Sequence, residues 1–456
     1  MTKTVHIGCG AGFMGDRFDA SLAILRDMQT RQGPKYLMFE VLAERTLAVA
    51  QNVRRDDPAK GYSPYLDHYI RPALAKAKAG GVTIVSNMGA ANPAGAARRV
   101  LEIAAEQGVD GVTVATVNGD DLLETIPAAE IAAMDTMEGI GFDGRPIIAA
   151  NAYLGARPVA QAIATGADVV LVGRTTDSAL ALGPLIHEFG WGPEDLDLLA
   201  QGTVAGHLLE CGGQVTGCYF ADPGFKDVPD VARAGFPIAE CRADGTFTVT
   251  KPAGTGGLVN RATVTEQLLY EMHDPAAYLV PDVTLDCTDL DATEEAPNRV
   301  RITGARGHAP PPTLKATVSV DGGWLGEAFM TYSGPNALAR ADLAGEIVRT
   351  RLAEQGQNEP VRIETLGTGA THDGGSVTRR AARNLPTDGE FTVRVATQSV
   401  DKATAQRITD ELMMLYCSGP AAGGGFRGSV TSQIDTASVL IPGERIEPNV
   451  RVEVHR

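Results

Sequence analysis

The sequence contains few aromatic residues and no long apolar run, which argues against a protein that stacks nucleic-acid bases and against a membrane-spanning protein. Phe, Trp and Tyr make up 5% of the 456 residues, too few for a platform that stacks nucleic-acid bases. No segment approaches the roughly 20 apolar residues that span a bilayer. No signal peptide precedes the first apolar run, at residues 4–7. We therefore expect a cytoplasmic protein without a membrane segment.

Positive charge is also scarce. Lys and Arg number 40 against 56 Asp and Glu, which gives a formal net charge of −16. Such a surface repels phosphate polymers and anionic lipid, so neither nucleic acid nor a membrane is expected as a partner. A small anionic substrate stays compatible with this charge, because a local group of Arg side chains and backbone N–H groups can bind it.

Cysteine pairs with CxxC spacing are absent. The six cysteines lie far apart in the sequence, at positions 9, 211, 218, 241, 287 and 417. In a chain of this length the pattern indicates reduced thiols in the cytosol, most of them packed as small apolar residues.

Glycine, by contrast, is abundant at 52 residues, and the first part of the chain repeats a strand–helix pattern. Short apolar runs occur at 5–7, 36–41, 82–86, 111–117, 146–150 and 167–172. Runs without alternation are typical of parallel strands buried on both faces, and helical segments such as 93–107 separate them. We predict an α/β domain over 1–275, with a doubly wound, Rossmann-like parallel sheet, flanking helices and a long polar, glycine-rich loop region that carries the site.

The second part of the chain predicts a smaller α+β layer domain over 276–456, with β-α-β blocks in tandem. A hairpin is expected to turn at 321–323, followed by a helix at about 337–355 and a strand at 361–366. A strand at 390–399, a helix at 402–417 and a strand at 434–441 form the next block. Two glycine-rich segments, 367–375 and 419–427, lie in this part, and the second suits a flap or a subunit contact.

A glycine-rich loop, Gly8–Arg17, follows the first predicted strand. Its glycines allow backbone N–H groups to approach an anion at the start of the next helix. Asp16 disfavours NAD(P), since a carboxylate among these amides would repel a pyrophosphate. We predict that Gly10, Gly12, Asp16 and Arg17 bind an acid substrate, with Arg17 facing it. A turn that only packs helix on strand is the alternative.

Polar residues stand at the ends of the predicted strands, where ligands bind in open parallel sheets. They are Glu40, Asn87, Asp120, Asn151, Arg174 and Asp177. We assign Asn87, Asn151 and Arg174 to substrate binding, together with Asn92 before the helix at 93–107. Glu40 also has the position of a ribose-binding acid in a dinucleotide fold. Asp177 is a catalytic candidate, although Asp120 and Asp177 also suit helix capping.

His207 and Glu210 are three residues apart, so on a helix they share a face. This spacing allows a metal pair or a His–carboxylate general base, with an ordinary polar helix face as the alternative. Cys211 is added as a candidate nucleophile, against a buried inert thiol. Lys251 and Thr255 lie in a loop rich in backbone amides, and we predict that they bind a carboxylate or phosphate of the substrate. A solvated surface loop without a role is the alternative.

The motifs taken together resemble the acyclic terpene utilisation protein AtuA family. The resemblance rests on residues 7–17, 91–95, 151–156, 173–177, 188–191, 206–211, 220–224 and 251–252. It implies a place in the breakdown of acyclic terpenes through acyl-CoA intermediates, in a family whose reaction is largely unknown. It also implies a small companion protein and a two-subunit assembly.

We expect an enzyme of carboxylic-acid or acyl-CoA catabolism, a hydro-lyase or isomerase that moves protons on a branched or polycarboxylic substrate. The alternatives are a non-catalytic subunit that binds a ligand and a small partner, and an NAD(P)-dependent oxidoreductase. The sequence requires no cofactor, leaves a divalent metal open and disfavours NAD(P). A homo-oligomer is expected.

Overall fold

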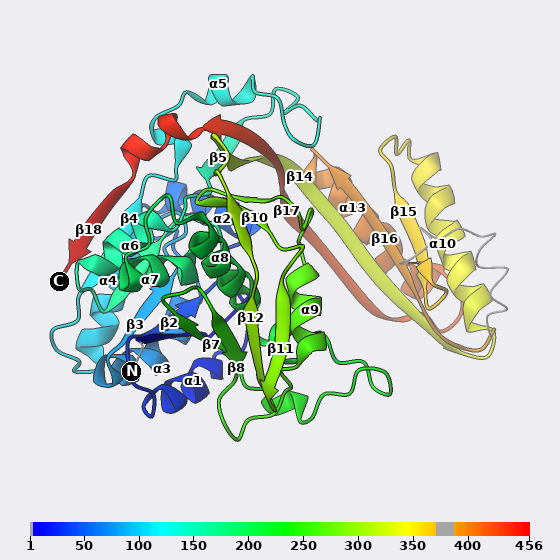
Figure 1. The fold of residues 1–456 in the computed structure, drawn as a ribbon. Helices are drawn as coiled ribbons and strands as arrows, with labels where there is room; N and C mark the ends of the chain where they lie inside the picture. The colour runs from blue at the N-terminus through cyan, green and yellow to red at the C-terminus, as the bar shows by residue number, and fades with distance from the viewer. Residues whose placement is uncertain (1–2, 371–386) are drawn as a thin grey trace. The chain divides into compact units, whose positions relative to one another are not determined.

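A computed structural model describes residues 3–370 and 387–456 (Figure 1). The chain forms two compact units, Met1–Ser319 with Thr436–Arg456, and Val320–Asp435. The predicted boundary at residue 275 falls inside the first unit, because strands beyond it continue the sheet of that unit. In the glycine-rich segment 367–375, the residues from 371 onward lie outside the described part of the chain.

Five parallel strands form the centre of the first unit. They lie in the order β1 (Thr4–Cys9), β2 (Lys35–Phe39), β3 (Val82–Ser86), β6 (Val169–Val172) and β4 (Val114–Asn118). Each was predicted from an apolar run, and nearly all of their residues are buried. The prediction of a mixed α/β fold with parallel strands and flanking helices is confirmed; its Rossmann-like detail stays a prediction.

Antiparallel strands extend this sheet at both sides, which the sequence did not predict. Beyond β1 lie β7 (Ile238–Arg242), β8 (Phe247–Thr250), β12 (Arg299–Thr303) and β11 (Asp291–Ala296), and beyond β4 lies β18 (Arg451–His455). The result is a mixed ten-stranded sheet. A separate small sheet contains β13 (Arg306–His308), β10 (Val283–Asp286) and β9 (Tyr278–Val280).

The strand predicted at 146–150 forms as β5 (Ile147–Ala152), but its expected place in the parallel sheet is wrong. It pairs instead with β14 (Thr313–Gly334), and the Tyr153 N–H donates to the Lys315 carbonyl oxygen at 2.9 Å. Its end still lies beside the parallel strands, because Asn151 bridges Asp121 just after β4.

Helices cover the sheet in two groups. The first comprises α1 (Ala20–Met28), α3 (Leu66–Gly80) and α4 (Pro93–Glu106), and the second comprises α6 (Arg157–Ala164), α7 (Ala179–Phe189) and α8 (Leu196–Glu210). The chain reverses direction along the sheet between β4 and β6, so right-handed crossovers put the two groups on opposite faces. Further helices of this unit are α2 (Glu44–Asp56), α5 (Ala128–Ala132) and α9 (Arg261–Leu269).

Helix α8 is buried on all sides from Leu199 to Glu210. Two glycines allow neighbouring elements to approach it closely. A Cβ on Gly202 would lie 2.6 Å from Leu182, and a Cβ on Gly206 would lie 2.5 Å from the carbonyl oxygen of Ser178. Helix α8 therefore ends directly beside the loop that follows β6.

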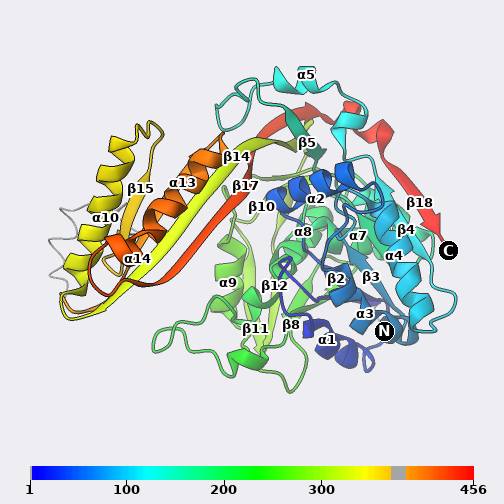
Figure 2. The same ribbon diagram turned by 180° about the vertical axis from the view of Figure 1, so that it is seen from behind.

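The second unit has an antiparallel sheet in the order β15 (Arg362–Leu366), β16 (Gly389–Ser399), β14 and β17 (Gly424–Pro442), as Figure 1 shows; Figure 2 shows β14 and β17 from behind. Helices α10 (Ala337–Glu354), α13 (Lys402–Met413) and α14 (Leu415–Ser418) pack on it around a core that includes Tyr332, Phe391 and Leu412. The predicted hairpin at 321–323 is wrong, because β14 continues through Gly322 and Gly323 as one strand. These glycines instead allow close approach, since a Cβ on Gly323 would lie 2.4 Å from the Ser399 carbonyl oxygen.

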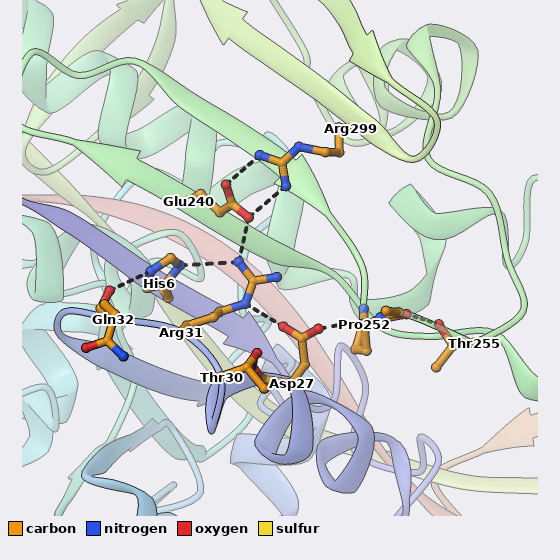
Figure 3. A network of polar contacts seen from close by, with 10 residues as sticks. His6, Asp27, Thr30, Arg31, Gln32, Glu240, Pro252, Thr255 and Arg299 are labelled. Carbon is orange, nitrogen blue, oxygen red and sulfur yellow. Dashed lines mark hydrogen bonds and ion pairs between the residues drawn. The ribbon is translucent and has the colours of Figure 1, made fainter.

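An ion-pair network joins β1 to the antiparallel extension of the sheet (Figure 3). The Glu240 carboxylate accepts hydrogen bonds from Arg299 at 2.6 and 2.8 Å and from Arg31 at 2.5 Å. Arg31 also pairs with Asp27 of α1 and donates to Nδ1 of His6 at 3.4 Å. Although burial opposes ionisation, the two arginines lower the pKa of Glu240 to about 2.

Among the described residues, we find no helix that combines the length and the apolar character needed to cross a bilayer.

We predict that Gly206→Ala destabilises the protein by about 2 kcal/mol, although alanine favours an isolated helix by about 1 kcal/mol. The reason is that the added Cβ meets the backbone of Ser178. Urea unfolding provides the measurement. Gly80→Ala in α3 is the matched control, because its Cβ has no neighbour closer than 3.6 Å. Equal effects of the two substitutions would contradict the close packing of α8.

We predict that Glu240→Gln lowers stability at neutral pH by about 3 kcal/mol, which is the value of a pKa depressed from 4.5 to about 2. A depressed folded-state pKa stabilises above the unfolded value, and this stability is lost as pH falls from 4.5 towards 2. As the pH is lowered through this range, the free energy of unfolding should therefore fall more steeply for the wild type than for Glu240→Gln. Glu295→Gln, which removes a more exposed pair with Arg301, should change little.

Candidate functional site

Five predicted residues meet at the carboxyl ends of the parallel strands and form what we call the strand-end cluster: Glu40, Asn87, Asp120, Asn151 and Arg174. The Asn87 amide donates to Glu40 at 2.8 Å, and the Asn151 amide donates to Asp120 at 2.8 Å. The backbone N–H of Arg174 donates to the same Asp120 carboxylate at 2.9 Å. A hydrogen-bonded polar group of this kind is expected of a binding or catalytic site.

Arg174 is the buried cation of the cluster, with only 2% of its surface exposed. Its guanidinium lies 4.1 Å from the centre of the Tyr153 ring and donates to Asp177 at 2.8 Å and to the Leu42 carbonyl oxygen. Its Nε is buried and has no hydrogen-bond partner. Because a buried donor without a partner is costly, Nε–H is a natural contact for an oxygen atom of a ligand.

The carboxyl groups around Arg174 resist ionisation. Burial and the charge of Asp177 raise the pKa of Glu40 to about 8, although Arg174 acts in the opposite direction. Burial also raises the pKa of Asp120 to about 6 and raises that of Asp177. Groups whose protons exchange near neutral pH are suited to general acid–base work.

His207 and Glu210, at the end of α8, form a buried pair. Nε2 of His207 lies 3.1 Å from the Leu268 carbonyl oxygen, which can only accept, so Nε2 carries a hydrogen. Nδ1 lies 3.0 Å from Oε1 of Glu210, and this contact requires one proton between the two atoms. The pair therefore exists as imidazolium with carboxylate or as imidazole with carboxylic acid.

Burial raises the pKa of Glu210 to about 7, against the opposing effect of His207. Burial alone would lower the pKa of His207, but the hydrogen bond and charge of Glu210 raise it above its usual value. Burial and Glu210 also raise the pKa of the Cys211 thiol, which disfavours a thiolate at neutral pH.

Close backbone contacts bring the end of α8 to the strand ends. Gly206 lies against Ser178, the neighbour of Asp177, and a Cβ on Gly12 would lie 2.2 Å from the backbone carbon of Cys211. Asp177 correspondingly raises the pKa of both Glu40 and Glu210 through its charge. The strand-end cluster and the His207–Glu210 pair thus act electrostatically as one site.

The predicted ligand-binding groups of the glycine-rich loop form hydrogen bonds with other groups of the protein. The Asp16 carboxylate accepts from the N–H groups of Gly12 at 3.0 Å and Arg17 at 2.7 Å, so it occupies the amides that an anion would use. Arg17 donates to the Ala234 carbonyl oxygen at 2.9 Å and pairs with Asp19 at 3.1 Å. The contacts of Arg17 thus lie within the protein; whether it also faces a ligand stays a prediction.

The glycines themselves are explained by packing. A Cβ on Gly8 would lie 2.4 Å from Ile24, and one on Gly10 would lie 2.6 Å from Phe39. These contacts account for the glycines without a pyrophosphate. Glu40, which has the position of a ribose-binding acid in a dinucleotide fold, accepts from Asn87 and from the Leu42 N–H at 3.0 Å.

Asn92 caps α4, as its side chain accepts from the Gly95 N–H at 2.9 Å. It also lines a cavity of about 90 Å³ together with Asp120 and Asn151. Lys251 and Thr255 bond to each other, since Nζ donates to the Thr255 carbonyl oxygen at 2.7 Å. Their loop contacts α1, where the Ala253 N–H donates to Asp27 at 3.4 Å, and belongs to the region of Figure 3.

Sequence reasoning missed several residues of the site. Tyr153 supports Arg174 and donates to Glu44, and it follows Asn151 so closely that the strand-end rule could have included it. Gln267 donates to the His207 carbonyl oxygen at 3.2 Å, and the Tyr278 ring lies 5.7 Å from the ring of His207. No pattern near Gln267 or Tyr278 indicated a role, because only the fold brings them to α8.

Within residues 3–370 and 387–456, we find no group of three His, Cys, Asp or Glu side chains arranged to hold a metal ion. The predicted His207–Glu210 metal pair is thus not joined by a third such ligand among the described residues.

A comparison with protein-family models gives a match over residues 5–452 to the model described as acyclic terpene utilisation family protein AtuA. The chain belongs to this family. Comparisons with curated proteins and with solved structures gave no match. The AtuA model covers both the strand-end cluster and the His207–Glu210 pair, and the resemblance inferred from the sequence motifs is confirmed.

We predict that Glu40→Gln raises stability above pH 8 by at least about 1 kcal/mol and has little effect at pH 4. Because the folded-state pKa of Glu40 is raised, the wild-type protein loses stability as pH rises from 4.5 to about 8. The Glu40→Gln variant does not lose it, since an amide does not titrate. Both hydrogen bonds to Oε1 can be kept by glutamine. Thermal unfolding between pH 4 and 9 provides the measurement; parallel curves for the two proteins would contradict the shift.

Proposed function

We propose that this AtuA-family protein is an enzyme of carboxylic-acid or acyl-CoA catabolism, a hydro-lyase or isomerase acting on a branched or polycarboxylic substrate. The supporting observation is the presence of two carboxyl groups, the half-buried Glu40 and the buried Glu210, whose pKa values of about 8 and about 7 lie close to neutral pH. Enzymes tune carboxyl groups in this way for proton transfer. The predicted cytoplasmic location and homo-oligomeric state belong to the same proposal.

The surroundings of the two carboxyl groups give them different roles. Glu210, whose ionised form His207 stabilises, removes a proton from carbon. Glu40, whose pKa burial and the charge of Asp177 raise to about 8, stays protonated at neutral pH. It gives its proton to the departing hydroxyl group, which leaves as water while the carbon–carbon double bond forms. For an isomerase, the same acid returns a proton to carbon.

In this scheme His207 acts on Glu210 and does not contact the substrate. Both of its ring nitrogens are engaged, one by Leu268 and the other by Glu210. It therefore positions Glu210 and shares its proton, while the carboxyl group meets the substrate. Arg174 supplies the unpartnered Nε–H for a carboxylate or thioester oxygen, and the stacking on Tyr153 keeps its guanidinium plane fixed.

The test is incorporation of solvent deuterium at carbon. The purified protein is incubated in D₂O with branched 3-hydroxy acids, their unsaturated counterparts and the CoA thioesters of both, and exchange is followed by NMR. We predict that the wild type exchanges at least one of these compounds. Glu210→Gln should slow this exchange by about 100-fold or more, because the base is lost while the hydrogen bond to His207 can be kept.

The pH dependence of exchange separates the two carboxyl groups. The rate should rise as Glu210 ionises near pH 7 and fall as Glu40 ionises near pH 8. Glu40→Gln, which cannot give up a proton, should lower the rate across this range and leave no fall near pH 8. Glu266→Gln, in an exposed pair with Lys226, is the matched control. Unchanged exchange in Glu210→Gln and Glu40→Gln would overturn the roles given to these two residues, and the absence of exchange in the wild type would favour a non-catalytic binding subunit.

A further inference from the structure

Lys315 lies near the start of β14, the strand that pairs with β5 (Figure 1). Tyr153, which directly follows β5, donates its N–H to the Lys315 carbonyl oxygen at 2.9 Å. Nζ of Lys315 lies 4.9 Å from the centre of the Tyr153 ring, and the Arg174 guanidinium lies 4.1 Å from the same centre. One aromatic ring therefore lies beside two cations, and Lys315 belongs to the immediate surroundings of the strand-end cluster.

The two cations differ in their access to solvent. Arg174 is buried, whereas 41% of the Lys315 side chain is exposed. The ring between them is 8% exposed at Tyr153, so the buried and the exposed cation are separated by no more than one side chain. A ligand that contacts Arg174 with one end can therefore reach Lys315 with another group.

Lys315 has an ion pair with Glu44 that is easily exchanged. Nζ lies 3.5 Å from Oε1 of Glu44, which is longer than a charge-assisted hydrogen bond. The Glu44 side chain is also 40% exposed, and exposed pairs of this kind contribute little to stability. Because the Tyr153 hydroxyl donates to the same oxygen atom, Glu44 keeps a partner when Lys315 turns to another anion.

The charges around Arg174 determine which group of a ligand lies where. Arg174 is already paired with Asp177 at 2.8 Å, and its Nε–H offers a single hydrogen bond to a single oxygen atom. Asp177 and Glu40 lie near enough for their charges to act on Arg174, and they would repel a further anionic group beside it. An anionic group away from the reacting end is therefore bound more favourably at Lys315.

We propose that Lys315 binds a second anionic group of the substrate, a carboxylate or a phosphate, while the reacting end lies at Arg174. Lys315 is then a specificity-determining residue, because it distinguishes ligands that carry this group from ligands that lack it. Glu44 competes with the anionic group for Nζ of Lys315. The inference rests on the proposed function for the identity of the site, but its test requires only binding.

The test compares ligands that differ in the second anionic group. Isothermal titration calorimetry measures the binding of succinate, glutarate and adipate, each beside the monocarboxylate of equal chain length, and of coenzyme A as the probe that carries phosphate. We expect one of the dicarboxylates, or coenzyme A, to bind the wild type about tenfold or more tightly than it binds Lys315→Met. Monocarboxylates should bind both proteins alike, since methionine keeps the apolar part of the side chain and removes only the charge.

Glu44→Gln tests the competition in the opposite direction. Glutamine can still accept the hydrogen bond from the Tyr153 hydroxyl, but it no longer attracts Lys315 by charge. This variant should bind the preferred probe several-fold more tightly than the wild type does. Lys226→Met, which removes an exposed ion pair with Glu266, is the matched control and should bind every probe like the wild type.

The two kinds of probe separate the sources of the anionic group. A dependence on Lys315 that is confined to dicarboxylates identifies a carboxylate, and one confined to coenzyme A identifies a phosphate. Affinities that are equal in the wild type and Lys315→Met would overturn the proposal, as would a wild type that binds none of the probes. Should Lys315→Met not fold, which circular dichroism reveals, Lys315→Gln takes its place.

Failure of this inference is distinguishable from failure of the proposed reaction. A wild type that shows binding dependent on Lys315 but no deuterium exchange would overturn the reaction and leave the anion site. Deuterium exchange whose KM is the same in the wild type and Lys315→Met would leave the reaction and overturn the role of Lys315. The expected result for an exchanging substrate is a KM that rises about tenfold with an unchanged kcat.

Discussion

The site depends on the close approach of helix α8 to two loops of the parallel sheet. Gly206 lies against Ser178 and Gly12 lies against Cys211, in both cases so closely that a single added carbon would meet backbone atoms. These contacts bring His207 and Glu210 to the strand ends. Because backbone cannot yield as a flexible side chain does, the position of the pair relative to Asp177 is determined by packing rather than by hydrogen bonds of the site itself.

Burial then determines the protonation states of the carboxyl groups in the site. Burial raises the pKa of Glu40, Asp177 and Glu210, and among the described residues Arg174 and His207 act in the opposite direction. Carboxyl groups in such an environment hold protons at a pH where exposed ones have lost them. The network around Glu240 shows the opposite case in the same unit, since two arginines bind one carboxylate there and lower its pKa to about 2. Hydrogen bonds and charges from Arg299 and Arg31 outweigh burial at Glu240, whereas burial dominates at Glu40 and Glu210.

The glycine-rich loop shows how one motif can have a structural explanation. Its glycines are required because Ile24, Phe39 and Cys211 approach them, and Asp16 satisfies the amides that resembled an anion site. The loop still contributes to the site, through the contact of Gly12 with the end of α8. The same reasoning applies at 321–323, where Gly322 and Gly323 permit close approach inside β14 instead of forming the predicted turn.

The sequence by itself determined the five parallel strands and the polar residues at their ends, because buried strands have continuous apolar runs and the residues that follow them share one edge of the sheet. The His207–Glu210 spacing was likewise local information. Only the tertiary structure decided that β5 leaves the sheet, that antiparallel strands extend it, and that Tyr153, Gln267 and Tyr278 surround the site. These features depend on contacts between residues far apart in the chain, which no local pattern encodes.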